Sequence, residues 1–326
     1  MSAKTGSAGM AAMAAVLVSV SPAAAQQATS STQGSHDVAV ALVDLGANSL
    51  VSKDANVRFV DLTPRLKEGD RHAVRRVGKM DHGDIVAQSF VDEYRRIDPE
   101  ARITFYTVNP FVERGMAGST MFSRSMLLQA LPKLKETSVR VAITTFGVED
   151  EASGNRILKD FQDAGLVVFA ASPNSREDRG IWPAASPSVI SVADGVTGDS
   201  GFMKSRSWAS WVDVVGNGIY HNGTIDTDGS SFATPRVAAY GAYLARARPE
   251  IGVDEMRNAI VRSAVTVRIH DRDFPKIGGD TTAARFREQV TQIGRATQVA
   301  AAGPAPAPAT RAAAARTMSM AAMAGR

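Results

Sequence analysis

The sequence predicts an α/β fold of three layers, with a central, mostly parallel sheet flanked by helices. Short runs rich in β-branched residues alternate along the chain with longer segments in which apolar residues recur at helical spacing. The short runs are apolar at nearly every position, as strands are when helices cover both faces of their sheet. Strand–helix alternation of this kind indicates parallel strands joined by helical crossovers.

Each expected element follows from its local pattern. The expected strands are Val38–Val43, Val57–Val60, Ile103–Val108, Val139–Thr145, Leu166–Ala171 and Val189–Ala193. The expected helices are Gly83–Arg96, Met121–Lys135, Gly154–Ala164, Phe232–Arg246, Val253–Ser263 and Ala283–Ala300. Open parallel sheets carry their sites at the carboxyl ends of the strands, so polar residues that follow these strands are the candidates for a site.

The amino-terminal residues have the pattern of a secretory signal peptide. Lys4 supplies the positive charge, an apolar stretch runs from Met10 to Val20, and small residues end at Ala25. We expect residues 1–25 to be a signal peptide that is cleaved near Ala25. The protein is then expected to be exported, to the periplasm or to the extracellular medium.

Composition divides the rest of the chain into three parts. Residues 26–35 consist of Gln, Ser, Thr, Ala and Gly and predict a flexible lead-in. Residues 303–326 form a low-complexity tail rich in Pro and Ala, which begins as an extended linker. One folded domain is expected between them, over residues 36–302. Its interior contains no run that is long and apolar enough to be a stable membrane span.

Charge and cysteine content exclude several classes of protein. The formal net charge is +4, but four of the cations lie in the expected leader and tail. These four are Lys4, Arg311, Arg316 and Arg326. The remaining domain is balanced, so it lacks the net basic surface that nucleic-acid binding requires. The chain has no cysteine, which excludes disulfides, thiol catalysis and thiolate metal sites.

Four polar residues stand where a parallel sheet would carry its chemistry. Asp44 follows the first expected strand, and Asn174 lies just beyond the strand that ends at Ala171. His82 and Ser231 each stand at the start of an expected helix. Each residue alone has a common structural explanation, as a strand terminator, a turn residue or a helix cap. A serine at a helix start also has its own N–H and the positive end of the helix beside it, which suit a negative charge.

Taken together and in order, these segments resemble the subtilase family of serine proteases. The matching motifs are Val43-Asp-Leu-Gly46, His82-Gly-Asp-Ile-Val-Ala87 and Gly229-Ser-Ser-Phe-Ala-Thr-Pro235. The order Asp, His, Ser along the chain is that of subtilisin. Segments that begin at Asp98, Trp182 and Ser207 are also similar to family sequences. The resemblance runs from about Val38 to Ser263 and implies a subtilisin-like fold.

This resemblance implies a serine endopeptidase that hydrolyses peptide bonds through an acyl-enzyme. Ser231 would attack the peptide carbonyl, and His82 would take the proton of its hydroxyl. Asp44 would hold the tautomer of His82 and stabilise its charged form. Asn174 and the N–H of Ser231 would stabilise the oxyanion.

The resemblance also implies where protein or peptide substrates, the expected partners, would bind. The edge expected to pair with an extended substrate is Thr145, Phe146 and Gly147. The pocket for the side chain before the scissile bond is expected to be lined by Ala171, Ser172 and Pro173.

Several positions depart from the family pattern. Asp84 stands where the family usually has threonine, Pro173 where glycine is common, and Arg236 where histidine is usual. The loop that builds a tight calcium site in many relatives is missing, so no cofactor is expected to be required, and a structural calcium ion is left open. Few residues separate the expected cleavage point from the first strand. An inhibitor or chaperone that acts in trans is therefore a candidate partner.

Three alternatives stay open on the sequence. The main one is a catalytically weak or silent subtilase-fold protein that binds peptides or a protein partner, which Asp84 and Pro173 favour. A nucleotide-binding α/β enzyme is disfavoured because no Gly-rich phosphate loop follows the first strand. An esterase of the α/β-hydrolase type would need a Gly-x-Ser-x-Gly elbow, and the segment around Ser231 lacks its second glycine.

Overall fold

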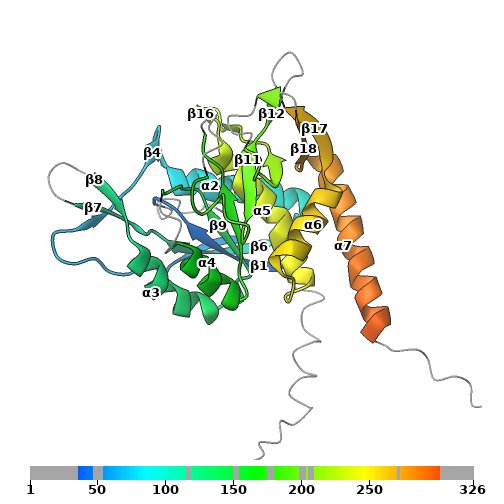
Figure 1. The fold of residues 1–326 in the computed structure, drawn as a ribbon, viewed down its shortest axis with the longest axis horizontal. Coiled ribbons are helices and arrows are strands. Elements are labelled where there is room, and N and C mark those ends of the chain that lie inside the picture. The colour runs from blue at the N-terminus through cyan, green and yellow to red at the C-terminus, as the bar shows by residue number, and fades with distance from the viewer. Residues whose placement is uncertain are drawn as a thin grey trace, which may run out of the picture. The chain divides into compact units, whose positions relative to one another are not determined.

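The computed structural model describes residues 36–46, 54–114, 119–149, 154–174, 180–197, 203–204, 209–269 and 272–301. The expected signal peptide, lead-in and tail lie outside the described residues. Within them, six helices and a nine-stranded sheet form the main architecture (Figure 1).

The central sheet has the strand order β17-β18-β14-β11-β10-β9-β1-β6-β2. Its strands are β1 (Asp37–Val43), β2 (Val57–Asp61), β6 (Arg102–Val108), β9 (Val141–Thr144), β10 (Val167–Ala171), β11 (Ile190–Asp194), β14 (Val214–Gly216), β17 (Val265–Ile269) and β18 (Arg272–Lys276). Neighbouring strands pair in parallel except β17 and β18 at one edge, which confirms the mostly parallel sheet. The carboxyl ends of β1, β9 and β10 therefore lie side by side.

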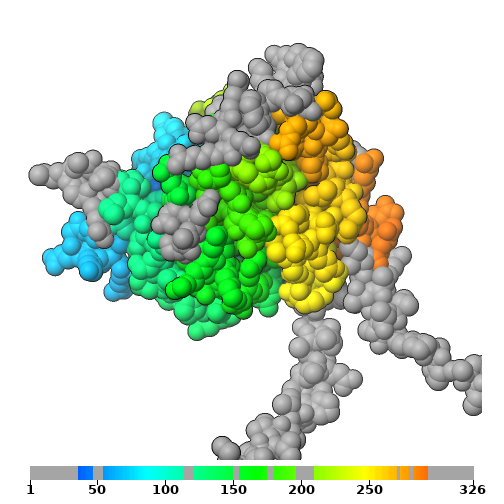
Figure 2. All heavy atoms as spheres, in the orientation of Figure 1, coloured from blue at the N-terminus to red at the C-terminus, as the bar shows by residue number. Residues whose placement is uncertain are grey.

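Helices cover both faces of this sheet. They are α2 (His82–Ile97), α3 (Arg124–Lys135), α4 (Gly154–Asp163), α5 (Ser230–Ala247), α6 (Val253–Ser263) and α7 (Asp280–Ala301). Helices α2, α5, α6 and α7 pack on one face, and α3 and α4 pack on the other (Figure 1). In the space-filling view, α3 and α4 (teal and green) form the lower left of the visible face and α6 (yellow) the lower right (Figure 2). The expected three layers are thus present.

The continuous apolar character of β1 follows from this layering. Val40 and Leu42 belong to the core beneath α2 and α5, whereas Ala41 and Val43 belong to the core beneath α3 and α4. Successive side chains of a strand point to opposite faces, so a strand buried on both faces is apolar at every position. No helix among the described residues has both the length and the apolarity that crossing a membrane requires.

Small sheets and hairpins complete the described fold. One sheet joins β3 (Arg71–His72), β7 (Phe111–Arg114) and β8 (Ser119–Phe122). The hairpins are β4 (Arg76–Val77) with β5 (Met80–Asp81), β12 (Val196–Thr197) with β13 (Met203–Lys204), and β15 (Tyr220–His221) with β16 (Asp226–Thr227). The helix expected from Met121 begins at Arg124 instead, because residues 119–122 pair with β7.

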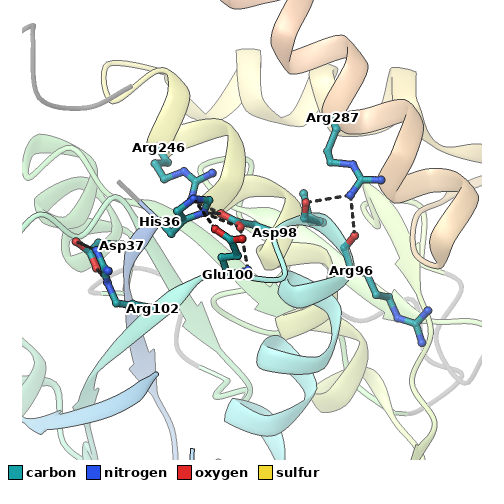
Figure 3. A network of polar contacts seen from close by, with 9 residues as sticks. His36, Asp37, Arg96, Asp98, Glu100, Arg102, Arg246 and Arg287 are labelled. Atoms are coloured by element: carbon teal, nitrogen blue, oxygen red, sulfur yellow. Dashed lines mark hydrogen bonds and ion pairs between the residues drawn. The ribbon is translucent and has the colours of Figure 1, made fainter. Parts of the chain in front are cut away.

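A network of charged residues ties the start of β1 to the ends of α2 and α5 (Figure 3). Asp98 lies at its centre, 2.9 Å from His36 Nδ1 through Oδ1, and it accepts a hydrogen bond of 2.6 Å from Arg246 Nη1 through Oδ2. His36 Nε2 also lies 3.2 Å from Glu100 Oε2. Burial raises the pKa of Asp98, but the bonds from Arg246 and His36 outweigh burial and hold that pKa below its ordinary value.

We expect Asp98→Asn to lower the free energy of unfolding by about 1–2 kcal/mol at neutral pH, because an amide cannot replace the charge-assisted bonds. A carboxyl group whose pKa is lowered by folding stabilises the protein above its unfolded-state pKa, and that contribution is lost as the pH falls through the folded-state pKa. The difference between the two proteins should therefore shrink as the pH falls below about 4, the ordinary range of an aspartate side chain. Urea unfolding along a pH series measures it, and a difference that does not change with pH would contradict the role given to Asp98.

Candidate active site

Asp44 and His82 meet between the end of β1 and the start of α2. Asp44 directly follows β1, His82 is the first residue of α2, and their exposed fractions are 2% and 1%. Nδ1 of His82 lies 2.9 Å from Asp44 Oδ1 and 3.0 Å from Oδ2. An ionised carboxylate only accepts hydrogen bonds, so the imidazole proton sits on Nδ1. Nε2 is then left as a proton acceptor.

Two further donors compensate the buried charge of Asp44. The Leu45 N–H donates to Oδ1 at 2.5 Å, and the Thr145 hydroxyl donates to Oδ2 at 2.6 Å. Strands β1 and β9 pair in parallel with Val43 opposite Thr144, so Asp44 and Thr145 are the next residues of each strand. The sequence placed Thr145 only at the substrate edge, and its contact with Asp44 was missed. Its position directly after the neighbouring strand was the available signal.

Ser231 is the second residue of α5 and is 6% exposed. Its hydroxyl donates to the carbonyl of Thr145 at 3.5 Å and, among the described residues, makes no hydrogen bond to His82. The ring of His82 lies beside the next residue, Phe232, with 5.6 Å between ring centroids. Serine and histidine thus come close on two helices of the same layer, with the hydrogen bond between them not formed. Such bonds are often long in unliganded sites and shorten with substrate.

The side-chain amide of Asn174 has a defined orientation. Its Oδ1 accepts a hydrogen bond of 3.0 Å from the Ser230 N–H and also lies 3.0 Å from the Ser230 hydroxyl, which donates to the Ser172 carbonyl at 2.5 Å. A backbone N–H can only donate, so the amide oxygen must face Ser230 and Nδ2 must face away from it. The sequence identified Asn174 but missed Ser230 as the residue that orients it.

Gly229 allows the side chain of Asn174 to lie close to the start of α5. Its φ of +148° is one that L side chains rarely adopt, and a Cβ there would lie 3.0 Å from Asn174 Nδ2. Helix α5 starts with the next residue, and the first N–H groups of a helix have no intrahelical acceptor. The Ser231 N–H and Asn174 Nδ2 are therefore two donors beside the positive end of α5, an arrangement that suits a developing negative charge.

The two expected substrate segments lie next to each other. Residues 145–147 follow β9, residues 171–173 begin at the last residue of β10, and these strands pair in parallel with Thr144 opposite Ala170. Phe146 is buried among aromatic rings, with 5.1 Å between its centroid and those of Phe111 and Phe122. Gly147 is exposed. Gly147 is therefore the one residue of this segment that is exposed, and the substrate role of both segments stays a prediction.

Three residues that depart from the family pattern lie around these elements. Asp84 is buried in the first turn of α2, Pro173 is half-buried, and Arg236 lies on α5. No group of three or more His, Asp or Glu side chains suited to hold a metal ion occurs in the part of the chain that the structure describes.

A family model described as "Subtilase family" matches residues 35–292. Among curated proteins, "Subtilisin-like protease 4" of Arthroderma gypseum is 37% identical over 90 residues, and the protein of the same name from Trichophyton rubrum is 34% identical over 90 residues. Each alignment covers 26% of this chain and 22% of the relative. The matched segment therefore spans about a fifth of the length of these curated relatives.

Two solved structures share the fold. The prenylagaramide maturation protease PagA matches with a TM-score of 0.53 and 17% identity, over 78% of this chain and 94% of that one. A serine-to-alanine mutant of the protease domain of PatA matches with a TM-score of 0.56 and 19% identity, over 80% of this chain and 98% of that one. At these identities the likeness concerns the fold alone.

The contact between Thr145 and Asp44 predicts a difference between two adjacent threonines. Thr145→Val removes a donor to a buried carboxylate and should lower the free energy of unfolding by about 1.5–3 kcal/mol. Thr144→Val is the matched control, since its hydroxyl donates to the neutral carbonyl of Phe169, and it should cost about 0.5–1.5 kcal/mol. Urea unfolding of both variants measures the difference. Equal costs, or a larger one for Thr144→Val, would contradict the contact.

Proposed function

This chain belongs to the subtilase family of serine peptidases, and we propose that Asp44, His82 and Ser231 are its catalytic triad, with Asn174 as an oxyanion donor. The observation that carries this proposal is the buried pair of Asp44 and His82, with 2.9 Å between Oδ1 and Nδ1. A buried carboxylate that is hydrogen-bonded to Nδ1 fixes the tautomer of the histidine, and the helix that contains Ser231 begins beside it.

The proposed reaction follows from the roles of these groups. Ser231 Oγ attacks the carbonyl carbon of a peptide bond while His82 Nε2 takes the hydroxyl proton. The imidazolium that forms is stabilised by Asp44, and it then protonates the leaving amine as the C–N bond breaks. Water attacks the acyl-enzyme in the second half, with His82 again as base and then acid, and this step regenerates Ser231. Overall, one peptide bond and one water give a carboxylate and an amine.

Oxyanion stabilisation is assigned to Asn174 Nδ2 and the Ser231 N–H. The Ser230 N–H holds the amide oxygen of Asn174 at 3.0 Å, which leaves Nδ2 as the group that can donate. The positive end of α5 adds to the attraction for negative charge. Since these groups are held in place before reaction, they need little reorganisation as the charge forms.

Thr145 is proposed as the residue that contacts both Asp44 and Ser231, the first and last members of the triad. Its hydroxyl holds Asp44 at 2.6 Å, and its carbonyl accepts the hydroxyl of Ser231 at 3.5 Å. A substrate that pairs with residues 145–147 would contact the backbone at this same point. Substrate binding could thereby release Ser231 from the Thr145 carbonyl and allow it to face His82.

Peptide binding without turnover is a second candidate function, and one observation favours it. The Ser231 hydroxyl donates to Thr145 in place of His82, so the nucleophile is not activated in this conformation. A fluorophosphonate distinguishes the two functions, because it forms a covalent bond only with an activated serine.

We also propose that the protein is exported after cleavage near Ala25, and that an inhibitor or chaperone acts on it in trans. The cleavage point lies outside the described residues.

We expect Ser231→Ala to lower kcat for peptide hydrolysis by about five to six orders of magnitude while the melting temperature stays nearly the same. Hydrolysis of a mixed peptide library, with cut sites mapped by mass spectrometry, measures the loss. Ser89→Ala is the matched control, because Ser89 is a buried serine of α2 whose hydroxyl has no hydrogen-bond partner among the described residues. Hydrolysis that persists in Ser231→Ala, or that is lost equally in Ser89→Ala, would overturn the assignment.

Asn174→Ala should lower kcat about 10²- to 10³-fold and leave KM nearly unchanged, since the lost bond forms only in the transition state. This magnitude is the one known for the oxyanion asparagine of subtilisin. Steady-state kinetics on a peptide found in the library measure both constants. A rise in KM with an unchanged kcat would place Asn174 in substrate binding and would contradict its oxyanion role.

A further inference from the structure

We propose that Arg236 is a positioning residue of the active site, because it holds the loop of residues 217–219 and this loop holds the turn that precedes Ser231. The inference rests on the proposed function, since it concerns how the proposed nucleophile and oxyanion donor are kept in place. Arg236 lies in the second turn of α5 and is one of the residues that depart from the family pattern.

A single nitrogen atom of Arg236 holds the loop on both sides of Gly218. Nη1 donates to the carbonyl of Asn217 at 2.8 Å and to the carbonyl of Ile219 at 2.6 Å. Within the loop, Asn217 Oδ1 accepts the Ile219 N–H at 3.0 Å. Hydrogen bonds from a charged donor are stronger than those between neutral groups, so the two bonds from Arg236 fix the loop against α5.

Gly218, at the centre of this loop, contacts the turn before Ser231. Its carbonyl accepts the Gly229 N–H at 3.1 Å. A Cβ on Gly218 would lie 2.7 Å from the carbonyl oxygen of Gly229 and 2.5 Å from the Cβ of Asp194, so a side chain at this position would not fit. Because the loop and the turn are in direct contact, a displacement of residues 217–219 would also displace Gly229.

Gly229 in turn contacts the groups proposed to stabilise the oxyanion. A Cβ on Gly229 would lie 3.0 Å from Asn174 Nδ2, and the N–H of the next residue, Ser230, donates to Asn174 Oδ1 at 3.0 Å. The Ser231 N–H follows one residue later. Arg236 is therefore connected with both proposed oxyanion donors through the backbone of two short segments.

The loop is also connected with the ring of His82. Tyr220 directly follows the loop, and its ring centroid lies 6.2 Å from that of Phe232. The ring of Phe232 lies beside that of His82, with 5.6 Å between their centroids. Phe232 and Arg236 are four residues apart on α5 and so share one side of the helix. The segment that Arg236 holds thus also supports the side chain that packs beside the proposed base.

Two carboxylates of α2, those of Glu93 and Asp92, lie with Arg236 on the wall of one pocket. Burial lowers the pKa of Arg236, although these two carboxylates raise it in part. Glu93 is buried and accepts the Tyr240 hydroxyl at 2.6 Å, whereas Asp92 is exposed and accepts a hydrogen bond from Gln88. An alternative role for Arg236 is therefore to compensate the charge of Asp92, and the experiment must separate that role from positioning.

Arg236→Met and Arg236→Lys, each made in the full chain, test the proposal. Methionine keeps an apolar stem but cannot donate, whereas the ammonium group of lysine can bridge the two carbonyls as Nη1 does. We expect Arg236→Met to lower kcat for a library peptide about 10- to 100-fold, with KM within about twofold of the parent value. The rate of fluorophosphonate labelling of Ser231 should fall by a similar factor. Arg236→Lys should keep kcat within about threefold of the parent value, because both bonds can form.

Two further variants separate positioning from other effects. Arg287→Gln is the matched control, because Arg287 Nη1 also donates to two backbone carbonyls, those of Arg96 and Ile97 at 3.3 Å each, but at the end of α2 (Figure 3). It should leave kcat and the labelling rate unchanged. Asp92→Asn added to Arg236→Met should restore no activity, since the loop carbonyls still lack their donor. Restored activity would assign Arg236 to charge compensation and overturn the proposal.

Hydrogen exchange of residues 217–231, followed by mass spectrometry, gives a readout that needs no catalysis. Arg236→Met should speed exchange in this segment about 10-fold, and Arg287→Gln should not. A parent protein that neither hydrolyses peptides nor reacts with a fluorophosphonate would refute the proposed function, and hydrogen exchange would then decide whether Arg236 holds the turn. Unchanged exchange or unchanged kcat in Arg236→Met, or an equal loss of activity in Arg287→Gln, would overturn the proposal. If Arg236→Met does not fold, Arg236→Gln, which keeps a neutral donor, takes its place in each comparison.

Discussion

The buried charge of Asp44 is the constraint on which the arrangement of the site depends. A carboxylate taken out of water costs several kcal/mol unless donors replace its hydration. Asp44 receives three donors, from the ring of His82, the N–H of Leu45 and the hydroxyl of Thr145. They come from the start of α2, the end of β1 and the end of β9, so this one group fixes the relative positions of a helix and two adjacent strands.

Hydrogen bonds of the same kind connect the neighbouring strand, β10, with the start of α5. At the end of β10, the side-chain oxygen of Asn174 and the carbonyl of Ser172 both contact Ser230, which starts α5. The Thr145 carbonyl contacts Ser231 directly. Three adjacent parallel strands thus each end in a residue that contacts a catalytic candidate or its neighbour. The candidate site therefore lies at the carboxyl ends of the strands, where the sites of open parallel sheets are found.

Some strands, helices and contacts of this structure could be predicted from the sequence, and others could not. Strands buried on both faces, such as β1, were found because they are continuously apolar, and α6 was predicted to the residue. Strands β14, β17 and β18 were missed because β14 has only three residues and the other two, the edge strand and its neighbour, carry charged side chains. Asp44, His82, Asn174 and Ser231 were predicted as site residues from their places after strands and at helix starts and from the resemblance to subtilases, and their catalytic roles stay predictions. The roles of Thr145 and Ser230 depend on strand register and on contacts between distant segments, which no local pattern reveals.

A structure of the protein with a covalent peptidyl phosphonate tests the central assignment most directly. We expect a bond from Ser231 Oγ to phosphorus, with one phosphonyl oxygen at about 2.7–3.1 Å from Asn174 Nδ2 and from the Ser231 N–H. His82 Nε2 should then lie within hydrogen-bond distance of the adduct, with its Nδ1 still bound to Asp44. An adduct on another residue, or a phosphonyl oxygen directed away from Asn174, would contradict the account.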